Sequence, residues 1–213
     1  MNPSEIAGLA AYPAVLRLFQ EHIDMQFADV RVWMRFPMKP EFQEGFNLAT
    51  ASRLMEIVSG LSVVLYEDPK VGPATEAKNR GPRFQHLLTE CWPHDPATDP
   101  PKNIVAETLY YFARNSLTHA LGLQQAAEPQ ILIGKAPLTP AQIERLEREP
   151  ALPEFLPGRP LQVMGVNVYR IDVRGLYWAT YRLVEKLVAA PAPMQAAERA
   201  IANGRGSRDG SRR

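Results

Sequence analysis

Two long stretches of this 213-residue chain carry apolar residues at steps of three and four positions. The first runs from Pro13 to Phe36, and the second runs from about Pro40 to Tyr66. This spacing gathers the apolar side chains on one face of an α-helix, and such a face is stable only when other elements cover it. The pattern therefore predicts a mainly α fold in which long amphipathic helices pack as a helical bundle.

Further helices are predicted from the same periodicity and from proline and glycine at their ends. They cover Pro82–Cys91, Asn103–Leu121, Pro140–Arg148 and a last long helix from Arg174 to Ala190. The stretch from Glu67 to Arg80 contains prolines and a glycine, and it is predicted to be a loop. Gly60 lies inside the second long helix, where glycine costs about 1 kcal/mol relative to alanine, and we interpret it as a close approach of another helix.

Two segments before the last long helix have the character of strands. Gln130–Lys135 is a short apolar run, and Leu161–Val173 is rich in β-branched residues. We expect them to pair as a small β-hairpin with a long insert, an appendage around residues 129–173 of a single domain that spans residues 1–191. Residues 192–203 are expected to form one more short helix, and the Gly/Ser/Arg-rich residues 203–213 a disordered basic tail.

The composition restricts the function and the compartment. The formal net charge is +1, so the chain carries no overall electrostatic signature for nucleic acid or for an anionic membrane. A single cysteine, Cys91, excludes a disulfide within the chain and favours the reducing cytoplasm. The N-terminus does not resemble a signal peptide, and no stretch reaches the roughly 18 apolar residues that span a bilayer, so we expect no membrane association.

The predicted helix Asn103–Leu121 carries an unusual set of polar groups on the half that faces away from the core. These are an aromatic ring, a guanidinium, an amide, a hydroxyl and an imidazole, on Tyr111, Arg114, Asn115, Thr118 and His119. An imidazole gives or takes a proton near neutral pH, and a guanidinium offers planar donors to a phosphate. The set therefore indicates a catalytic or phosphate-binding site.

Arg114 and His119 are five positions apart, which leaves them roughly 140° apart around a helix axis. They share one spot only if the arginine bends, or if two copies of the helix face each other across a two-fold axis. A structural interpretation stays open beside the catalytic one. In it, His119 caps the helix C-terminus and Arg114 pairs with an acidic side chain of a neighbouring helix.

The segment Arg114-Asn115-Ser116-Leu117-Thr118-His119 resembles the R-x4-H motif of HEPN domains, in which a polar residue follows the arginine. Residues 109–122 also resemble a stretch of many bacterial HEPN-like proteins that reads Arg-Asn, a small residue, leucine, any residue, histidine and then glycine three positions on. The resemblance covers roughly Pro40 to Ala190. One departure is Leu121, because a toxin subgroup of the family carries tyrosine two positions after the histidine.

This resemblance implies an all-α bundle that forms a homodimer through the motif helix, and metal-independent cleavage of RNA in a toxin or phage-defence setting. His119 is then a general acid or base, Arg114 stabilises the charge on the phosphate, and Asn115 orients one of them or the substrate. Tyr111 and Thr118 are expected to contact the substrate. Neither a metal nor another cofactor is expected. An alternative within the family is an inactive protein that binds a partner protein or a nucleotide. A third interpretation is a helical scaffold unrelated to HEPN domains.

Other short motifs carry weaker signals. Cys91 and His94 have the spacing of two zinc ligands, and His86 and Glu90 lie nearby, but a second matched pair is missing, so a buried cysteine beside a turn is preferred. Gly134-Lys135 lacks the glycine-rich loop that binds phosphates. The basic tail carries four arginines that would contact nucleic acid without sequence preference, namely Arg205, Arg208, Arg212 and Arg213.

Overall fold

The computed structural model of the chain describes residues 2–35, 46–66, 70–72, 76–94, 101–110, 130–134, 141, 161–163 and 166–209. Its helices are η1 (Pro3–Glu5), η2 (Leu9–Ala11), α1 (Pro13–Leu18), η3 (Phe19–Ile23), α2 (Asp24–Arg35), α3 (Asn47–Val64), α4 (Ala77–Cys91), α5 (Lys102–Thr108), α8 (Val173–Val188) and α9 (Pro191–Asp209). Its strands are β1 (Gln130–Gly134), β2 (Leu161–Val163) and β3 (Val166–Asp172). The predicted mainly α bundle with a small β insertion is confirmed.

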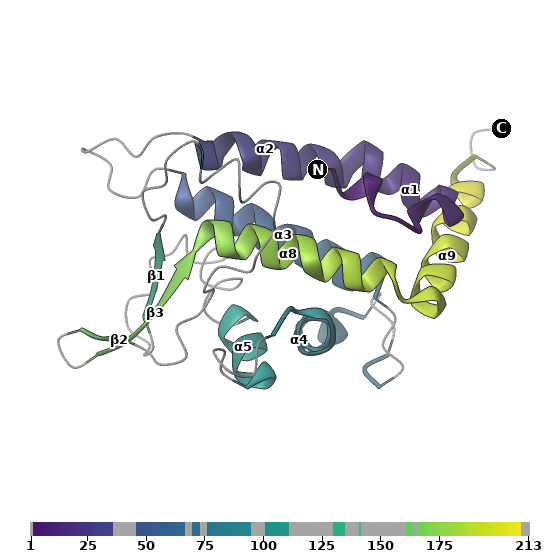
Figure 1. Cartoon of the computed structure of the whole chain (residues 1–213). Coiled ribbons are helices and arrows are strands. Elements are labelled where there is room, and N and C mark those ends of the chain that lie inside the picture. Colours follow the sequence, from purple (N-terminus) through teal and green to yellow (C-terminus); the bar gives the residue numbers. More distant parts are fainter. Residues whose placement is uncertain are drawn as a thin grey trace.

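The helices form layers around α3 and α8 (Figure 1). On one side lies a continuous rod made of α1, η3 and α2, in which η3 is a π-helical segment. On the other side lie α4 and α5 (Figure 1). Helix α9 turns across the end of the bundle beside α1, and the strands lie at the opposite end. This arrangement covers both faces of the central pair α3 and α8.

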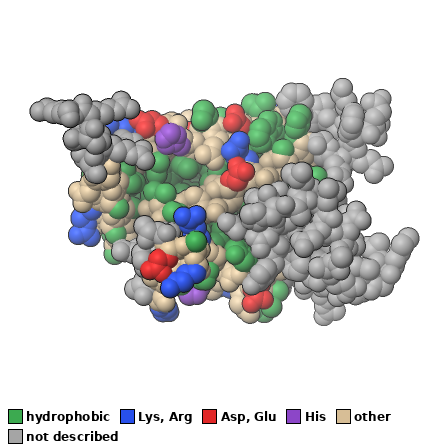
Figure 2. Space-filling view, turned by 180° about the vertical axis from the view of Figure 1, so that it is seen from behind, with side chains coloured by type: hydrophobic (Ala, Val, Ile, Leu, Met, Phe, Trp, Pro, Cys, Tyr) green, Lys and Arg blue, Asp and Glu red, His purple; other side chains and the backbone are tan. Residues whose placement is uncertain are grey.

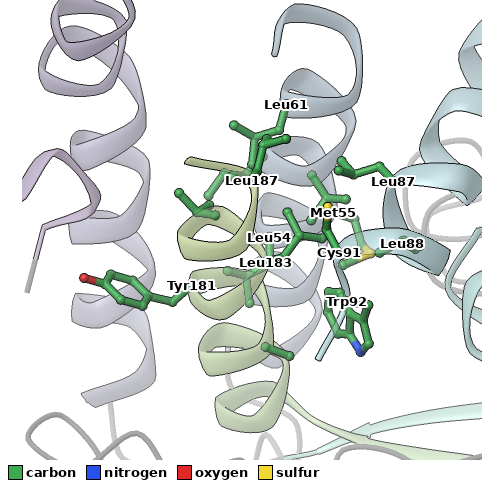
Figure 3. Packing of buried hydrophobic residues seen from close by; sticks show 14 of the residues in the cluster. Leu54, Met55, Leu61, Leu87, Leu88, Cys91, Trp92, Tyr181, Leu183 and Leu187 are labelled. Atoms are coloured by element: carbon green, nitrogen blue, oxygen red, sulfur yellow. The ribbon is translucent and has the colours of Figure 1, made fainter. Parts of the chain in front are cut away.

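The core is built by the apolar faces that the periodicity predicted. Leucine and methionine side chains of α3, α4 and α8 meet between these helices (Figure 3); they include Leu54, Met55, Leu61, Leu87, Leu88, Leu183 and Leu187. Between α2 and α8 the core is aromatic. The Phe27 ring lies edge-on to Tyr177 and Tyr181, with ring centroids 5.5 and 6.1 Å away. Such edge-to-face pairs stabilise a core beyond the area they bury.

The β insertion is a three-stranded sheet in the order β1-β3-β2. β2 and β3 form an antiparallel hairpin, whereas β1 runs parallel to β3 and pairs Gln130 with Val168 and Gly134 with Asp172. The predicted hairpin between Gln130–Lys135 and Leu161–Val173 is therefore corrected, because the hairpin lies within the second segment. A parallel pair needs a crossover of a dozen or more residues, and residues 135–160 are long enough to provide one.

Two predicted helix boundaries and the interpretation of Gly60 differ from the structure. α4 begins at Ala77, within the segment predicted to be a loop, and Pro82 lies inside this helix. Proline usually marks a first helical turn, which explains the late predicted start. α9 continues to Asp209, beyond the predicted end of the short helix at residue 203. Among the described residues, no atom of another element lies within 4 Å of where a Cβ of Gly60 would be, so Gly60 marks an exposed position of α3 and no close helix approach.

Candidate functional site

The described part of the predicted motif helix is its first turns. α5 buries Val105 and Ala106 against the core, and Leu109, which follows α5, is buried there as well. Leu109, the residue after α5, has a φ of −64° and a ψ of −37°. These angles show that the backbone stays helical past the end of α5. The Tyr110 ring then packs against Phe84 of α4, with ring centroids 5.8 Å apart. Packing against α4 therefore holds Tyr110 in place, directly before the predicted site residues.

All five predicted site residues lie outside the described residues. Tyr111 follows directly after the last described residue of this segment, and Arg114, Asn115, Thr118 and His119 lie further along. The placement of these five side chains therefore stays a prediction. The same holds for two copies of the motif helix that face each other across a two-fold axis. The helix predicted at residues 140–148 also falls outside, apart from Ala141, which is helical.

The zinc interpretation of Cys91 and His94 gains no support. Cys91 ends α4 with its side chain buried, and burial raises the pKa of this thiol. Across the described ranges, His, Cys, Asp and Glu side chains form no group of three that would hold a metal ion. A buried cysteine beside a turn remains the interpretation of this segment.

One buried ion pair was not anticipated from the sequence. It joins Asp172, the last residue of β3, to Arg174 in the first turn of α8. Arg174 Nε and Nη2 lie 3.0 and 2.5 Å from the two carboxylate oxygens, and the Arg174 amide donates to Oδ1 at 2.9 Å. The side chains are only 9% and 20% exposed for Arg174 and Asp172. The carboxylate thus caps α8 and neutralises a buried cation.

Arg174 still has one unused donor group. Its Nη1 is buried and has no hydrogen-bond partner within the part of the chain that the structure describes. The signal in the sequence is an aspartate directly before an amphipathic helix with an arginine two positions on, which is an N-cap pattern. The sequence pattern predicts the boundary between strand and helix near this point, but it does not indicate the ion pair.

A second buried guanidinium, that of Arg83, donates hydrogen bonds to two backbone carbonyls. Its Nε donates to the carbonyl of Ser62 at 3.1 Å, and its Nη1 donates to the carbonyl of Gly72 at 2.9 Å. Gly72 has a φ of +91°, a conformation that favours glycine. Arg83 therefore ties α4 to the end of α3 and to the connection between them, and it has a structural role.

The surface offers apolar side chains as well as charges. On α2 and α3 the side chains of Met25, Val32 and Leu48 are 58%, 53% and 40% exposed. Phe46 is 47% exposed, and its ring stacks on that of Trp33 with centroids 6.4 Å apart. Figure 2 shows hydrophobic side chains at the surface with charges of both signs among them. Among the helices described, none is long and apolar enough to cross a membrane.

The chain shows no significant match to any protein-family model, curated protein or solved structure. The resemblance to HEPN domains therefore rests on the motif of residues 114–119 and on the helical pattern around it.

Proposed function

We propose that this protein is a HEPN-like, metal-independent endoribonuclease that acts on single-stranded RNA in the cytoplasm, in a toxin or phage-defence setting. The proposal rests on one observation. Arg114, Asn115 and His119 lie together on the half of one predicted helix that faces away from the core. The mainly α bundle supports it, as does the firm packing of the first turns of that helix in α5. The lone cysteine fits a reducing compartment.

The proposed reaction is an attack of a ribose 2′-oxygen on the adjacent phosphorus. The bond from phosphorus to the 5′-oxygen of the next nucleotide breaks, and the products are a cyclic 2′,3′-phosphate and a free 5′-hydroxyl. His119 takes the proton of the 2′-hydroxyl or gives one to the leaving oxygen. The Arg114 guanidinium stabilises the charge that builds on the phosphate oxygens. Asn115 fixes the orientation of the imidazole or of the substrate, which Tyr111 and Thr118 contact.

The test is cleavage of a mixed single-stranded RNA by the purified protein in the presence of EDTA. Parent protein is compared with His119→Ala and Arg114→Ala, and with His22→Ala as a matched control because His22 is exposed in the π-helical segment. The proposal predicts cleavage by the parent and the control and loss in both site variants. Absence of cleavage, or equal cleavage by all four proteins, would refute it.

A homodimer through the motif helix is part of the proposal. It explains how Arg114 and His119 share one cleft although they diverge by roughly 140° on a straight helix. The test mixes the Arg114→Ala and His119→Ala proteins after partial unfolding and refolding. In a mixed dimer one of the two shared sites is intact, so random mixing restores up to about a quarter of the parent activity. No recovery would place both groups in one chain.

A second candidate is an inactive HEPN-like protein that binds a partner protein. The exposed apolar side chains of Met25 and Val32 favour it, because they are seven positions apart and so lie on one face of α2, and exposed apolar surface is typical of protein interfaces. The cleavage assay separates the two candidates, since an inactive protein leaves the RNA intact. A binding role then predicts that Val32→Asp abolishes association with the partner without changing the melting temperature by more than about 2 °C.

A further inference from the structure

One face of α3 lies at the surface. The helix packs against α2, α4 and α8. Figure 1 shows α8 in front of α3, so Figure 2 looks onto the α3 side of the bundle from behind. Six exposed or partly exposed residues of this face recur at alternating steps of three and four positions, which is the spacing along which two helices pair. This stripe, the α3 seam, consists of Phe46, Ala49, Arg53, Glu56, Gly60 and Val63.

Gly60 in the α3 seam has no counterpart inside the chain that explains a glycine. Glycine weakens a helix interior. In α4 an internal contact gives the reason for Gly81, because a Cβ there would lie 2.9 Å from Tyr110 Cζ. At Gly60, by contrast, no atom of the described residues lies within 4 Å of where a Cβ would be. An exposed helical glycine lets the backbone of another helix come close, and such a helix would belong to another molecule.

We propose that the α3 seam is an interface with a second copy of this chain. The two α3 helices pack antiparallel across a two-fold axis that passes between Arg53 and Glu56. The steps along the seam are three, four, three, four and three residues, so they read the same in both directions. Each seam residue then faces the residue of the second copy that lies equally far from the axis. The facing pairs are Arg53 with Glu56, Ala49 with Gly60, and Phe46 with Val63.

These pairs are complementary in charge, size and polarity. Phe46 and Val63 are exposed apolar side chains, and Ala49 against Gly60 allows the two backbones to approach closely. Such self-complementarity is what an interface between identical surfaces requires.

The charges select the antiparallel direction. Within one helix Arg53 Nη1 lies 2.8 Å from Glu56 Oε2, so the two charged groups stand side by side. The antiparallel arrangement places each of them beside the opposite charge of the second copy. A parallel pair would place each charge opposite its own equivalent, and facing like charges are unfavourable. The interface uses none of the predicted RNA-site residues, so it does not rest on the proposed nuclease function.

The test measures the mass of the full chain and its variants by sedimentation. Arg53→Glu makes the seam acidic and Glu56→Arg makes it basic, so each variant alone places like charges across the axis. Each is expected to raise the dissociation constant of the pair about tenfold or more. A mixture of the two variants is expected to associate at least as tightly as the parent, because an acidic seam meets a basic one.

The matched control is the ion pair of Arg182 and Glu185 on α8, which has the same spacing of three residues. Arg182→Glu and Glu185→Arg are expected to sediment like the parent, alone and mixed. Gly60→Leu provides an uncharged variant. Its side chain meets open space within the described part of the chain, so the helical circular dichroism should be retained while association weakens about tenfold or more.

The outcomes separate this interface from the proposed pairing of the motif helices. A monomeric parent overturns both. A parent that associates, beside charge variants and Gly60→Leu of unchanged mass, overturns the α3 interface alone. Charge variants that lose association without recovering it on mixing would also overturn it, because their loss would not arise from charges that face each other across the axis.

Discussion

The start of α1 is capped by a side chain from the far end of the chain. Both carboxylate oxygens of Glu198 accept a hydrogen bond from the amide of Ala14 at 2.9 Å, and one of them also accepts from Val15 at 2.9 Å. The N-cap residue of α1 is Tyr12, which has no side-chain bond to the helix. Glu198 therefore replaces the missing local cap and ties α9 to α1.

The contribution of Glu198 to the free energy of unfolding follows from these contacts. Loss of a capping side chain costs about 0.5–2 kcal/mol, and loss of a negative charge at a helix N-terminus costs about 0.3–1 kcal/mol. Since Glu198 is partly buried and provides both, we expect Glu198→Ala to lower the free energy of unfolding by about 2 kcal/mol. Glu198→Gln keeps an acceptor and loses the charge, so about 1 kcal/mol is expected for it.

Urea unfolding followed by circular dichroism measures these values, and a melting temperature lowered by about 4–8 °C should accompany Glu198→Ala. The matched control is Glu56→Ala, which removes an ion pair to Arg53 whose side chains are 37% and 48% exposed for Arg53 and Glu56. Such an exposed pair contributes less than about 1 kcal/mol. Equal losses for Glu198→Ala and Glu56→Ala would contradict the capping role.

Three further predictions concern buried groups. Burial raises the pKa of Tyr181 from 10.0 to about 12. The unfolded chain therefore ionises first, and the free energy of unfolding falls as the pH rises from about 10 to 12. Unfolding curves at alkaline pH should show this loss for the parent protein and not for Tyr181→Phe. Burial raises the pKa of the Cys91 thiol, so iodoacetamide should alkylate it slowly in the native protein and fast in urea, and equal rates would speak against burial. Asp172→Asn leaves the Arg174 guanidinium without its counter-charge, so it should lower the free energy of unfolding in urea by about 2 kcal/mol. The double variant that adds Arg174→Met should regain most of that free energy.

The helical part of the fold was predictable because apolar periodicity is a local signal. The predicted helix Pro13–Phe36 corresponds to α1, η3 and α2, and Arg174–Ala190 corresponds to α8. The direction of β1 was not predictable, because it depends on pairing between residues far apart in the sequence. Equally, the sequence does not distinguish Gly60 from Gly81, although one faces open space and the other holds a tyrosine ring.

The residues of the candidate site are predicted from the sequence. The structure shows how the helical turns before them pack. The apolar periodicity of Asn103–Leu121 predicts that Val105 and Leu109 lie on the core face of the motif helix, and both are buried in the structure. The contact of Tyr110 with Gly81 and Phe84 could not be read from the sequence, since it requires the packing of α5 on α4. The same holds for the Asp172–Arg174 pair, which depends on how β3 leads into α8.

In the proposed function, Arg114 and His119 cleave RNA through attack by the ribose 2′-hydroxyl. The most direct measurement is the chemistry of the ends formed when the parent and His119→Ala are incubated with one RNA of defined sequence in EDTA. The proposed reaction gives cyclic 2′,3′-phosphate and 5′-hydroxyl ends with the parent, and leaves RNA intact with the variant and with a substrate methylated at the 2′-oxygens. Intact RNA with the parent, or 5′-phosphate ends that persist in His119→Ala, would contradict it.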